Sequence, residues 1–241
     1  MRSRVSPLLV LSHMRSYSTL VCHILGSHPE IDGYCETHLK YRSRLDLLRL
    51  RWRVRRLTGA PLHGHYLLDK ILHDYPITPA ILAHARTRAL ILVRRPSASI
   101  HSILTMGRQL GLIAWHQEPE AVARYYETRL RTLTQLAGTL GGRALLVRSE
   151  RLIADPAAQL SDITQFLGLH RHLEQNYRHF PHTGQPGCGD PIAIGASHTL
   201  ELRRERDGDA PLPGARLQAL EAAYAHALKT MSPPHPMASE H

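Results

Sequence analysis

Residues 8–36 read LLVLSHMRSYSTLVCHILGSHPEIDGYCE. The apolar run Leu8 to Leu11 is typical of a buried strand, and helical character begins at about Ser18. A strand, a turn and a helix start together make an anion site, because the N–H groups of the first helical turn and the positive end of the helix dipole point into the turn. Arg15 adds a full charge there, and hydroxyl donors come from Ser16, Ser18 and Thr19. The alternative is an ordinary turn whose Ser and Thr residues cap a helix.

Length and composition indicate one globular domain. The chain has 241 residues, of which 43% are hydrophobic and 21% charged, a balance typical of a folded protein with a sizeable core. We expect a single domain over residues 1–231 and a disordered polar tail over residues 232–241. The net charge of +10 and the pI of about 10.0 favour a polyanionic partner without choosing among nucleotide, nucleic acid and acidic membrane.

Several classes of protein are disfavoured by the sequence. No apolar run approaches the ~20 residues that a membrane span needs, and the apolar run near the N-terminus is too short for a secretory signal. The three cysteines, Cys22, Cys35 and Cys188, are far apart and form no CxxC pair, so we expect a reduced chain in the cytoplasm. The eighteen histidines show no HExxH or comparable spacing, and we predict no metal site.

Short apolar strands alternate with helices along the rest of the chain. We expect strands at residues 65–71, 89–93 and 144–147, and helices near 80–85, 97–104, 120–140, 157–167 and 214–231. Asp155-Pro156 has the pattern of a helix N-cap followed by Pro at the first helical position. Residues 180–198 are rich in Gly and Pro and predict a long loop. This alternation predicts an α/β fold, a P-loop-like parallel sheet with helices on both faces.

Positive charge follows every predicted strand. Arg15 follows the first strand, Lys70 ends the second, Arg94 follows the third, and Arg148-Ser149 follows the fourth. Ligands of open parallel sheets bind at the carboxyl ends of the strands. The sequence therefore predicts a pocket for an anion that carries more than one charged group.

The segment THLKYRSRLDLLRLRWRVRRLT, residues 37–58, is strongly basic. Leu45, Leu48 and Trp52, with Val54 and Leu57, recur near helical spacing and predict an amphipathic helix over residues 42–56. Such a helix suits a membrane surface, a nucleic acid or an acidic acceptor. The simpler interpretation is a packed helix with a solvated arginine face.

The pattern of the loop motifs separates the possible anions. Neither GxxxxGK[ST] nor GxGxxG occurs, which disfavours a standard ATP or GTP loop and NAD. The run Arg15-Ser16-Tyr17-Ser18-Thr19-Leu20 resembles the 5′-phosphosulfate loop [RK]-S-G-[ST]-[ST] of PAPS-dependent sulfotransferases. Residues 91–104, ILVRRPSASIHSIL, are similar to their 3′-phosphate motif, with Arg94 and Ser102 at the matching positions. The run from Ser149, SERLIADPAAQL, is similar to their Y-E-x-L-x-x-x-P passage.

The resemblance is closest to the tyrosylprotein branch and to bacterial relatives, and it covers residues 8–168. It implies the sulfotransferase fold, PAPS as sulfuryl donor and PAP (adenosine 3′,5′-bisphosphate) as product. In that branch the base is a Glu 21 residues after the loop Arg, which here is Glu36. A Lys before the 3′-phosphate strand matches Lys70. The resemblance thus implies Glu36 as general base, with His38 or His65 as substitutes, and Arg15 and Lys70 as the cations that stabilise the leaving group.

The resemblance also implies which residues hold the donor. They are Arg15, Ser16, Tyr17, Ser18, Thr19, Leu20, Arg94, Ser102 and Ser149, with Ser197 as a further candidate in a late loop. Three positions depart from the pattern: Tyr17 replaces Gly, Arg95 replaces Asp, and Ser149 replaces Tyr. The Gly normally permits close backbone approach to the phosphate. Tyr17 therefore predicts either a reshaped loop or a side chain that faces the acceptor.

Two alternatives and several unknowns stay open at this stage. A kinase-like phosphotransferase is disfavoured because no acidic pair for Mg²⁺ accompanies the loop. A protein that binds nucleic acid or membrane through residues 42–56 leaves Glu36, Lys70, Arg94 and Ser102 unexplained, although Glu36 and Lys70 could form a purely structural ion pair. The expected partner is a hydroxyl acceptor of unknown class. No nucleic acid is expected, and the basic segment hints at an acidic or membrane-associated acceptor.

Overall fold

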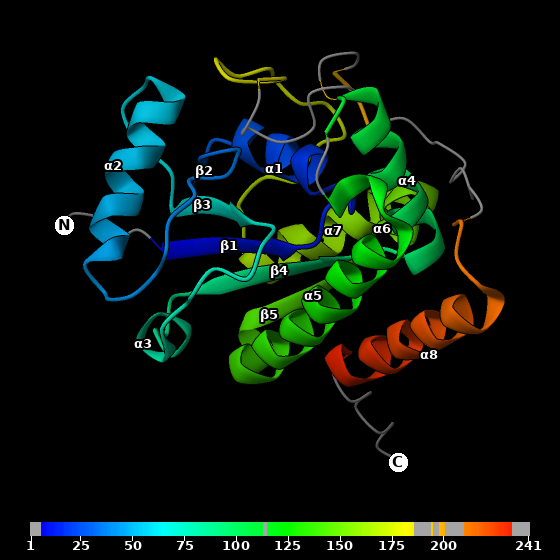
Figure 1. Ribbon diagram of the computed structural model, residues 1–241. Helices are drawn as coiled ribbons and strands as arrows, with labels where there is room; N and C mark the ends of the chain where they lie inside the picture. The colour runs from blue at the N-terminus through cyan, green and yellow to red at the C-terminus, as the bar shows by residue number, and fades with distance from the viewer. Residues whose placement is uncertain (1–5, 113–114, 186–193, 195–197, 201–209, 233–241) are drawn as a thin grey trace, which may run out of the picture.

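The computed structural model describes residues 6–112, 115–185, 194, 198–200 and 210–232. Its centre is a five-stranded parallel sheet with the strand order β2-β3-β1-β4-β5 (Figure 1). The predicted α/β class and the parallel sheet are thus confirmed. The strands are β1 (Ser6–Ser12), β2 (Ile31–Asp32), β3 (Tyr66–Ile71), β4 (Arg88–Val93) and β5 (Ala144–Arg148).

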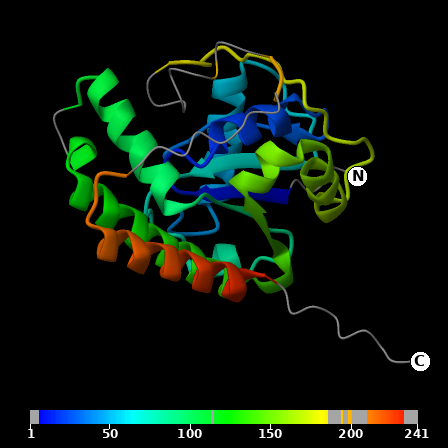
Figure 2. The ribbon, with the colours of Figure 1, turned by 90° about the vertical axis from the view of Figure 1, so that its right-hand side faces the viewer.

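Helices cover both faces of this sheet, as predicted. They are α1 (Ser18–Ser27), α2 (Asp46–Thr58), α3 (Pro79–Leu82), α4 (Pro96–Gln109), α5 (Pro119–Leu140), α6 (Ser149–Ala154), α7 (Pro156–Leu167) and α8 (Gly214–Met231), with 3₁₀ turns at Trp115–Gln117 and Gly141–Arg143. Figure 2 shows α8, in orange and red, lying alongside α5. In the described part of the chain, no helix is both long and apolar enough to cross a membrane.

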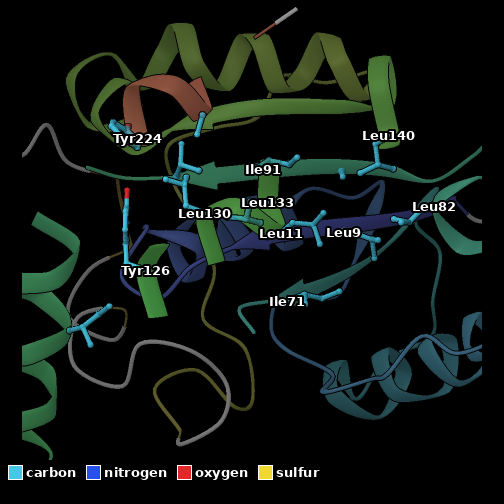
Figure 3. Packing of buried hydrophobic residues seen from close by; sticks show 14 of the residues in the cluster. Leu9, Leu11, Ile71, Leu82, Ile91, Tyr126, Leu130, Leu133, Leu140 and Tyr224 are labelled. Carbon is cyan, nitrogen blue, oxygen red and sulfur yellow. The ribbon is translucent and has the colours of Figure 1, made fainter. Parts of the chain in front are cut away.

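The alternating side chains of β1 divide the core into two clusters. Leu9 and Leu11 face one cluster, which is completed by apolar residues of α2, α3, α4, α5 and α8, and part of this packing is drawn in Figure 3. Leu8 and Val10 face the other cluster, which α1, α6 and α7 complete. Successive strand residues point to opposite faces, so a central strand that is apolar throughout must be covered on both sides. This double burial explains why residues 8–11 form an unbroken apolar run.

Local sequence signals mark several of the helix ends. The Asp155 side chain accepts a hydrogen bond from the Ala158 N–H at 3.1 Å, and Pro156 begins α7, as the sequence predicts. Gly59 and Gly168 end α2 and α7 with φ of 66° and 63°, the left-handed conformation that Gly adopts without steric cost. The sequence analysis does not predict β2 or α6. A two-residue strand and a helix of one and a half turns are too short to show a periodic pattern.

The apolar residues predicted for one face of α2 lie on two different sides of the helix. Leu50 and Val54 are fully buried against the sheet, whereas Leu45, Leu48 and Trp52 are 66%, 67% and 60% exposed. The helix starts later than predicted, at Asp46. Two apolar stripes run along this helix on opposite sides, and helical spacing alone cannot tell which of them meets the sheet. The arginines between them are exposed at the surface, as the simpler interpretation requires.

Some predictions lie outside the described residues. They are Ser197 as a donor contact, Cys188, most of the late loop over residues 180–198 and the disordered tail beyond Ser232. The single domain over residues 1–231 stays a prediction.

Candidate functional site

The turn between β1 and α1 has an unusual backbone. Arg15 and Tyr17 have positive φ angles of 63° and 61°, a conformation that costs a residue with a Cβ roughly 1 kcal/mol or more. Tyr17 therefore keeps the left-handed conformation expected of the Gly it replaces. Its ring lies 4.8 Å from the Arg94 guanidinium carbon in a cation–π contact. The substitution changes what lies beside Arg94 while the turn still leads directly into α1.

Four hydrogen bonds hold this turn in place. The Ser16 hydroxyl donates to the His13 carbonyl at 2.8 Å, and the Ser149 hydroxyl, from the start of α6, donates to the Ser16 carbonyl at 2.9 Å. The Met14 N–H donates to the Tyr125 hydroxyl of α5 at 3.0 Å. His13 accepts a hydrogen bond from the Arg94 N–H at 3.0 Å. A strained backbone conformation persists only when the surrounding contacts hold it in place. These hydrogen bonds hold the turn in this way.

The structure joins the two predicted phosphate motifs. Arg15 Nε donates to the Ser102 hydroxyl at 2.9 Å, although the two residues are 87 positions apart. Arg94 is buried at the end of β4, and its guanidinium donates to the Arg15 carbonyl at 3.1 Å. Arg15, Arg94 and Ser102 are thus joined by hydrogen bonds just before the start of α1. This set of donors suits an anion with more than one phosphate group.

A buried ion pair lies next to the same helix start. Lys70 Nζ is 3.2 Å from Glu36 Oε1, with the Lys70 side chain fully buried and that of Glu36 only 7% exposed. Lys70 also donates to the Thr19 hydroxyl at 3.1 Å. These contacts connect β3, α1 and the segment after β2. The predicted base and one predicted cation are therefore in direct contact beside the phosphate turn.

Asp69 holds the segment that carries Glu36 in place through hydrogen bonds. Its carboxylate accepts hydrogen bonds from the Thr37 N–H and hydroxyl, both at 2.8 Å, and from the Tyr41 hydroxyl at 2.7 Å. Burial raises the pKa of Asp69 from 3.8 to about 6, against the lowering effect of these bonds. The sequence analysis missed this role. Two adjacent charged residues inside the apolar strand YLLDKI were the available signal.

Replacing Asp69 with Ala should destabilise the fold by roughly 3 to 5 kcal/mol, because three buried hydrogen-bond donors lose their acceptor. Urea unfolding at pH 7 measures this change. Asp69→Asn is the matched control, since its amide keeps one carbonyl oxygen and should lose less. A loss below about 1 kcal/mol for Asp69→Ala would show that water replaces the carboxylate and that the network does not hold the segment.

The sequence analysis also missed Arg129, which contacts the strand that leads into the turn. Arg129 of α5 is 1% exposed and donates to the Ser12 and Ile71 carbonyls, both at 2.9 Å. It also pairs with Asp74 at 2.7 Å. Arg129 thereby ties together the carboxyl ends of β1 and β3. An arginine on a long amphipathic helix gives no sequence signal that distinguishes this role from surface exposure.

Several predicted site residues stand apart from this network. The Arg148 side chain, at the end of β5, is 49% exposed and lies 4.0 Å from Glu150. The next residue, Ser149 of α6, contacts the turn instead. Ser18 is buried in the first turn of α1, and Leu20 packs against the core cluster of that face. Arg95 is exposed, and its N–H donates to Glu150 at 2.7 Å. A carboxylate from α6 thus lies at the backbone of the position where the motif has Asp.

The two histidines named as substitute bases differ in position. His38 Nδ1 is 3.9 Å from Glu36 Oε2, and its side chain is 48% exposed. His65 directly precedes β3, and its carbonyl accepts from the N–H of Ser6 at the start of β1. His65 therefore lies at the amino end of the sheet, opposite Lys70. The length of β3 separates His65 from Lys70, so the structure does not bring His65 to Glu36.

Two buried histidines make the site sensitive to acid. Burial lowers the pKa of His13 and of His23 from 6.5 to about 4 in each case. Neutral His13 accepts from the Arg94 N–H through Nε2. His23 bonds the Thr19 carbonyl and the Thr183 hydroxyl, both at 2.9 Å. Protonation of His13 removes the acceptor that holds the Arg94 backbone.

Stability should therefore fall as the pH is lowered from 7 to 5. The unfolded chain takes up protons at both histidines near pH 6.5 while the folded chain does not, which favours unfolding. Asp69, with its raised pKa, acts in the opposite direction but is a single group. The expected net loss is roughly 2 to 3 kcal/mol, measured by urea unfolding at the two pH values. His23→Gln should remove just under about 2 kcal/mol, which is most of this net loss, and an unchanged slope would contradict the assignment.

The described residues also bear on the expectations for metal ligands and thiols. Within residues 6–112, 115–185, 194, 198–200 and 210–232, no group of three His, Cys, Asp or Glu side chains could hold a metal ion. Cys22 and Cys35 are buried free thiols. Burial raises the pKa of Cys22 to about 12, so its thiol stays protonated and unreactive at neutral pH.

Comparisons with known proteins agree with the resemblance seen in the motifs. No family profile matches the chain. Two mouse enzymes, heparan sulfate glucosamine 3-O-sulfotransferases 3B1 and 3A1, are each 32% identical over 131 residues, which is 50% of this chain and 31% of theirs. The chain thus spans about a third of the length of these relatives.

Solved structures establish the fold. The sulfotransferase domain of the curacin biosynthetic pathway has a TM-score of 0.63 at 18% identity and covers 93% of this chain and 99% of its own. The sulfotransferase domain of the Synechococcus PCC 7002 olefin synthase has a TM-score of 0.59 at 22% identity, with 93% and 96% covered. A mouse sulfotransferase in complex with PAP has a TM-score of 0.58 at 13% identity, with 93% and 84% covered. The predicted sulfotransferase fold is therefore confirmed.

Proposed function

We propose that this protein, which has the sulfotransferase fold, transfers a sulfuryl group from PAPS to a hydroxyl acceptor. The observation that carries the proposal is the single network that joins Arg15, Ser102 and Arg94 at the start of α1 and Lys70 and Glu36 beside it. Sulfotransferases share this fold, and two relatives with local sequence identity carry the same activity in their names. These likenesses support the proposal.

The side chains present fit a polyanionic nucleotide donor. Arg15, Lys70 and Arg94 bring three cations to the start of α1, against the two carboxylates of Glu36 and the buried Asp69. The positive end of α1 adds to this excess of positive charge. We assign the 5′-phosphate to the turn over residues 15–20 and the 3′-phosphate to Arg94 and Ser102. When bound, PAPS supplies a sulfuryl group attached to a phosphate oxygen.

The residues of the chain then have distinct tasks in the transfer. Glu36 would take the proton of the acceptor hydroxyl. The hydroxyl oxygen would bond to sulfur while the bond between sulfur and the phosphate oxygen breaks. Lys70 and Arg15 stabilise the negative charge that develops on that leaving oxygen. The ion pair between Lys70 and Glu36 keeps both groups at the same point before the substrates bind. Asp69 is a positioning residue, since it holds Thr37, the neighbour of Glu36.

Calorimetric binding of PAP tests the donor assignment. The chain should bind PAP with micromolar affinity and AMP at least about tenfold more weakly, because AMP lacks the 3′-phosphate, with ATP as a second control. Arg94→Ala should weaken PAP binding about tenfold or more and AMP binding by a smaller factor, because it also removes the hydrogen bond from Arg94 to the Arg15 carbonyl. Arg95→Ala is the matched control, since the neighbouring Arg95 is exposed and its main-chain bond to Glu150 survives the change. Absence of PAP binding by a folded sample would reject the proposal.

The acceptor requires a screen with radiolabelled PAPS. The names of the two mouse relatives give a sugar, glucosamine, as the acceptor. Glycans are therefore the first acceptors to test, followed by tyrosine peptides, lipids and small metabolites. The kinase-like alternative has no structural observation in its favour, and ATP binding tighter than PAP binding would revive it.

A further inference from the structure

The helix α2 has a second apolar face that nothing in the described structure covers. Leu50 and Val54 pack inward, whereas the large side chains of Leu45, Leu48 and Trp52 are 60–67% exposed. These three residues are spaced at i, i+3 and i+7, so they form one stripe along the outer side of the helix. The helix stands at the edge of the molecule beside β2 and β3 (Figure 1). A contiguous exposed apolar stripe of this kind marks an interaction surface.

Arginines line both sides of this stripe. Arg44, Arg51 and Arg55 recur at intervals of seven and four residues and flank one side, whereas Arg49 and Arg56 flank the other; all five are exposed. The Arg56 guanidinium lies 5.5 Å from the Trp52 ring centre. The sole acidic residue between positions 42 and 58 is Asp46, which is buried and neutralised by Arg49 at 2.6 Å. The outer face of α2 is therefore apolar at its centre and cationic at both margins.

We propose that this face of α2 docks on the surface of an anionic lipid bilayer. The helix would lie in the plane of the interface, with Leu45, Leu48 and Trp52 entering the boundary between headgroups and acyl chains. The flanking arginines would reach the phosphates of acidic lipids. This arrangement has the features of an interfacial helix, namely a cationic polar face, an apolar stripe and a Trp at the interface.

Charge decides against the other occupants. A second copy in a two-fold dimer would bring two sets of exposed arginines together, and like charges across an interface are unfavourable. A nucleic acid or an acidic glycan would satisfy the arginines but would leave the three apolar side chains in water. An anionic bilayer is the partner that satisfies both parts of the face.

Helix α2 is also attached to the segment that carries Glu36. Arg53 of α2 donates to the Thr37 carbonyl, and the Tyr34 hydroxyl donates to the Leu57 carbonyl at 3.3 Å. The segment that carries Glu36 is thus fastened to α2. The proposed docking does not depend on the proposed function.

Vesicle flotation with the full chain tests the proposal. The protein should float with vesicles of phosphatidylcholine containing about one-third phosphatidylglycerol and remain free with pure phosphatidylcholine. The double variant Leu48→Ser/Trp52→Ser should bind the anionic vesicles at least about tenfold more weakly. Leu110→Ser is the matched control, because Leu110 is another exposed apolar residue, 43% exposed, away from α2. It should bind as the unmodified chain does.

A charge series completes the test. Arg51→Gln/Arg55→Gln should weaken vesicle binding about fivefold for each arginine removed. Arg124→Gln/Arg131→Gln, on the exposed side of α5 at 66% and 65% exposure, should have little effect. Three results would overturn the proposal: equal binding to neutral vesicles, full binding by folded Leu48→Ser/Trp52→Ser, which would indicate a purely polyanionic partner, or no binding at all. Because PAP binding is measured separately, failure here would leave the proposed function intact.

Discussion

Replacing Glu36 with Gln should slow sulfuryl transfer about 10²- to 10⁴-fold, the contribution that a positioned general base typically makes. Glutamine keeps the size of the side chain and one oxygen for the hydrogen bond from Lys70, but it cannot accept the acceptor's proton. PAP binding should stay within about threefold, because the proton transfer stabilises the transition state and not the nucleotide complex.

The experiment follows initial rates with radiolabelled PAPS and an acceptor taken from the glycan and peptide screen. His38→Gln is the informative companion, because His38 lies 3.9 Å from the other oxygen of Glu36 and is the remaining candidate base. An unchanged rate in Glu36→Gln together with a large loss in His38→Gln would move the base from Glu36 to His38. A loss in Glu36→Gln alone, with normal PAP affinity, supports the proposed role.

Replacing Lys70 with Met should affect both catalysis and stability. Methionine preserves the apolar stem, but it leaves the Glu36 carboxylate, 7% exposed, without its cation at 3.2 Å. Breaking a buried pair by removing one partner costs roughly 3 to 5 kcal/mol. The rate should also fall by about 10²-fold or more, since a cation at the leaving oxygen is lost.

The double variant Lys70→Met/Glu36→Gln separates the two effects. It should recover much of the stability, because no unpaired buried charge remains, and it should stay inactive because both groups are missing. Urea unfolding and initial rates of all four proteins form a double-mutant cycle. If Lys70→Met is as stable as the unmodified chain, or if the double variant is no more stable than Lys70→Met, the pair is not the buried ion pair that the geometry indicates.

The contact between Arg15 and Ser102 links the two phosphate sites. Because Arg94 also donates to the Arg15 carbonyl, a substitution in the 3′-phosphate site should also weaken binding in the 5′-phosphate site. Such linkage suits a donor that carries phosphate at both ends. It also explains how a turn with two residues at positive φ keeps its shape without the Gly that the motif normally supplies.

Most strands and helices and the order of the site motifs could be predicted from the sequence, whereas the short elements β2 and α6 could not. The unbroken apolar run of residues 8–11 specifies a central strand, Asp155-Pro156 and Gly168 mark the ends of α7, and the positions of Arg15, Lys70 and Arg94 at successive strand ends follow from the parallel sheet. These features are readable because each depends on neighbours within one turn or one strand, where backbone geometry and burial leave a direct pattern in the residues.

Tertiary structure alone decided which partners these residues meet. Helical spacing allowed either stripe of α2 to pack, and the choice of Leu50 and Val54 came from contact with the sheet. Asp69 acts on Thr37 and Tyr41 from a neighbouring strand, and His65 lies one strand length away from the site. Hydrogen bonds and ion pairs between residues distant in the chain depend on how layers pack, and the pattern of any single segment does not carry that information.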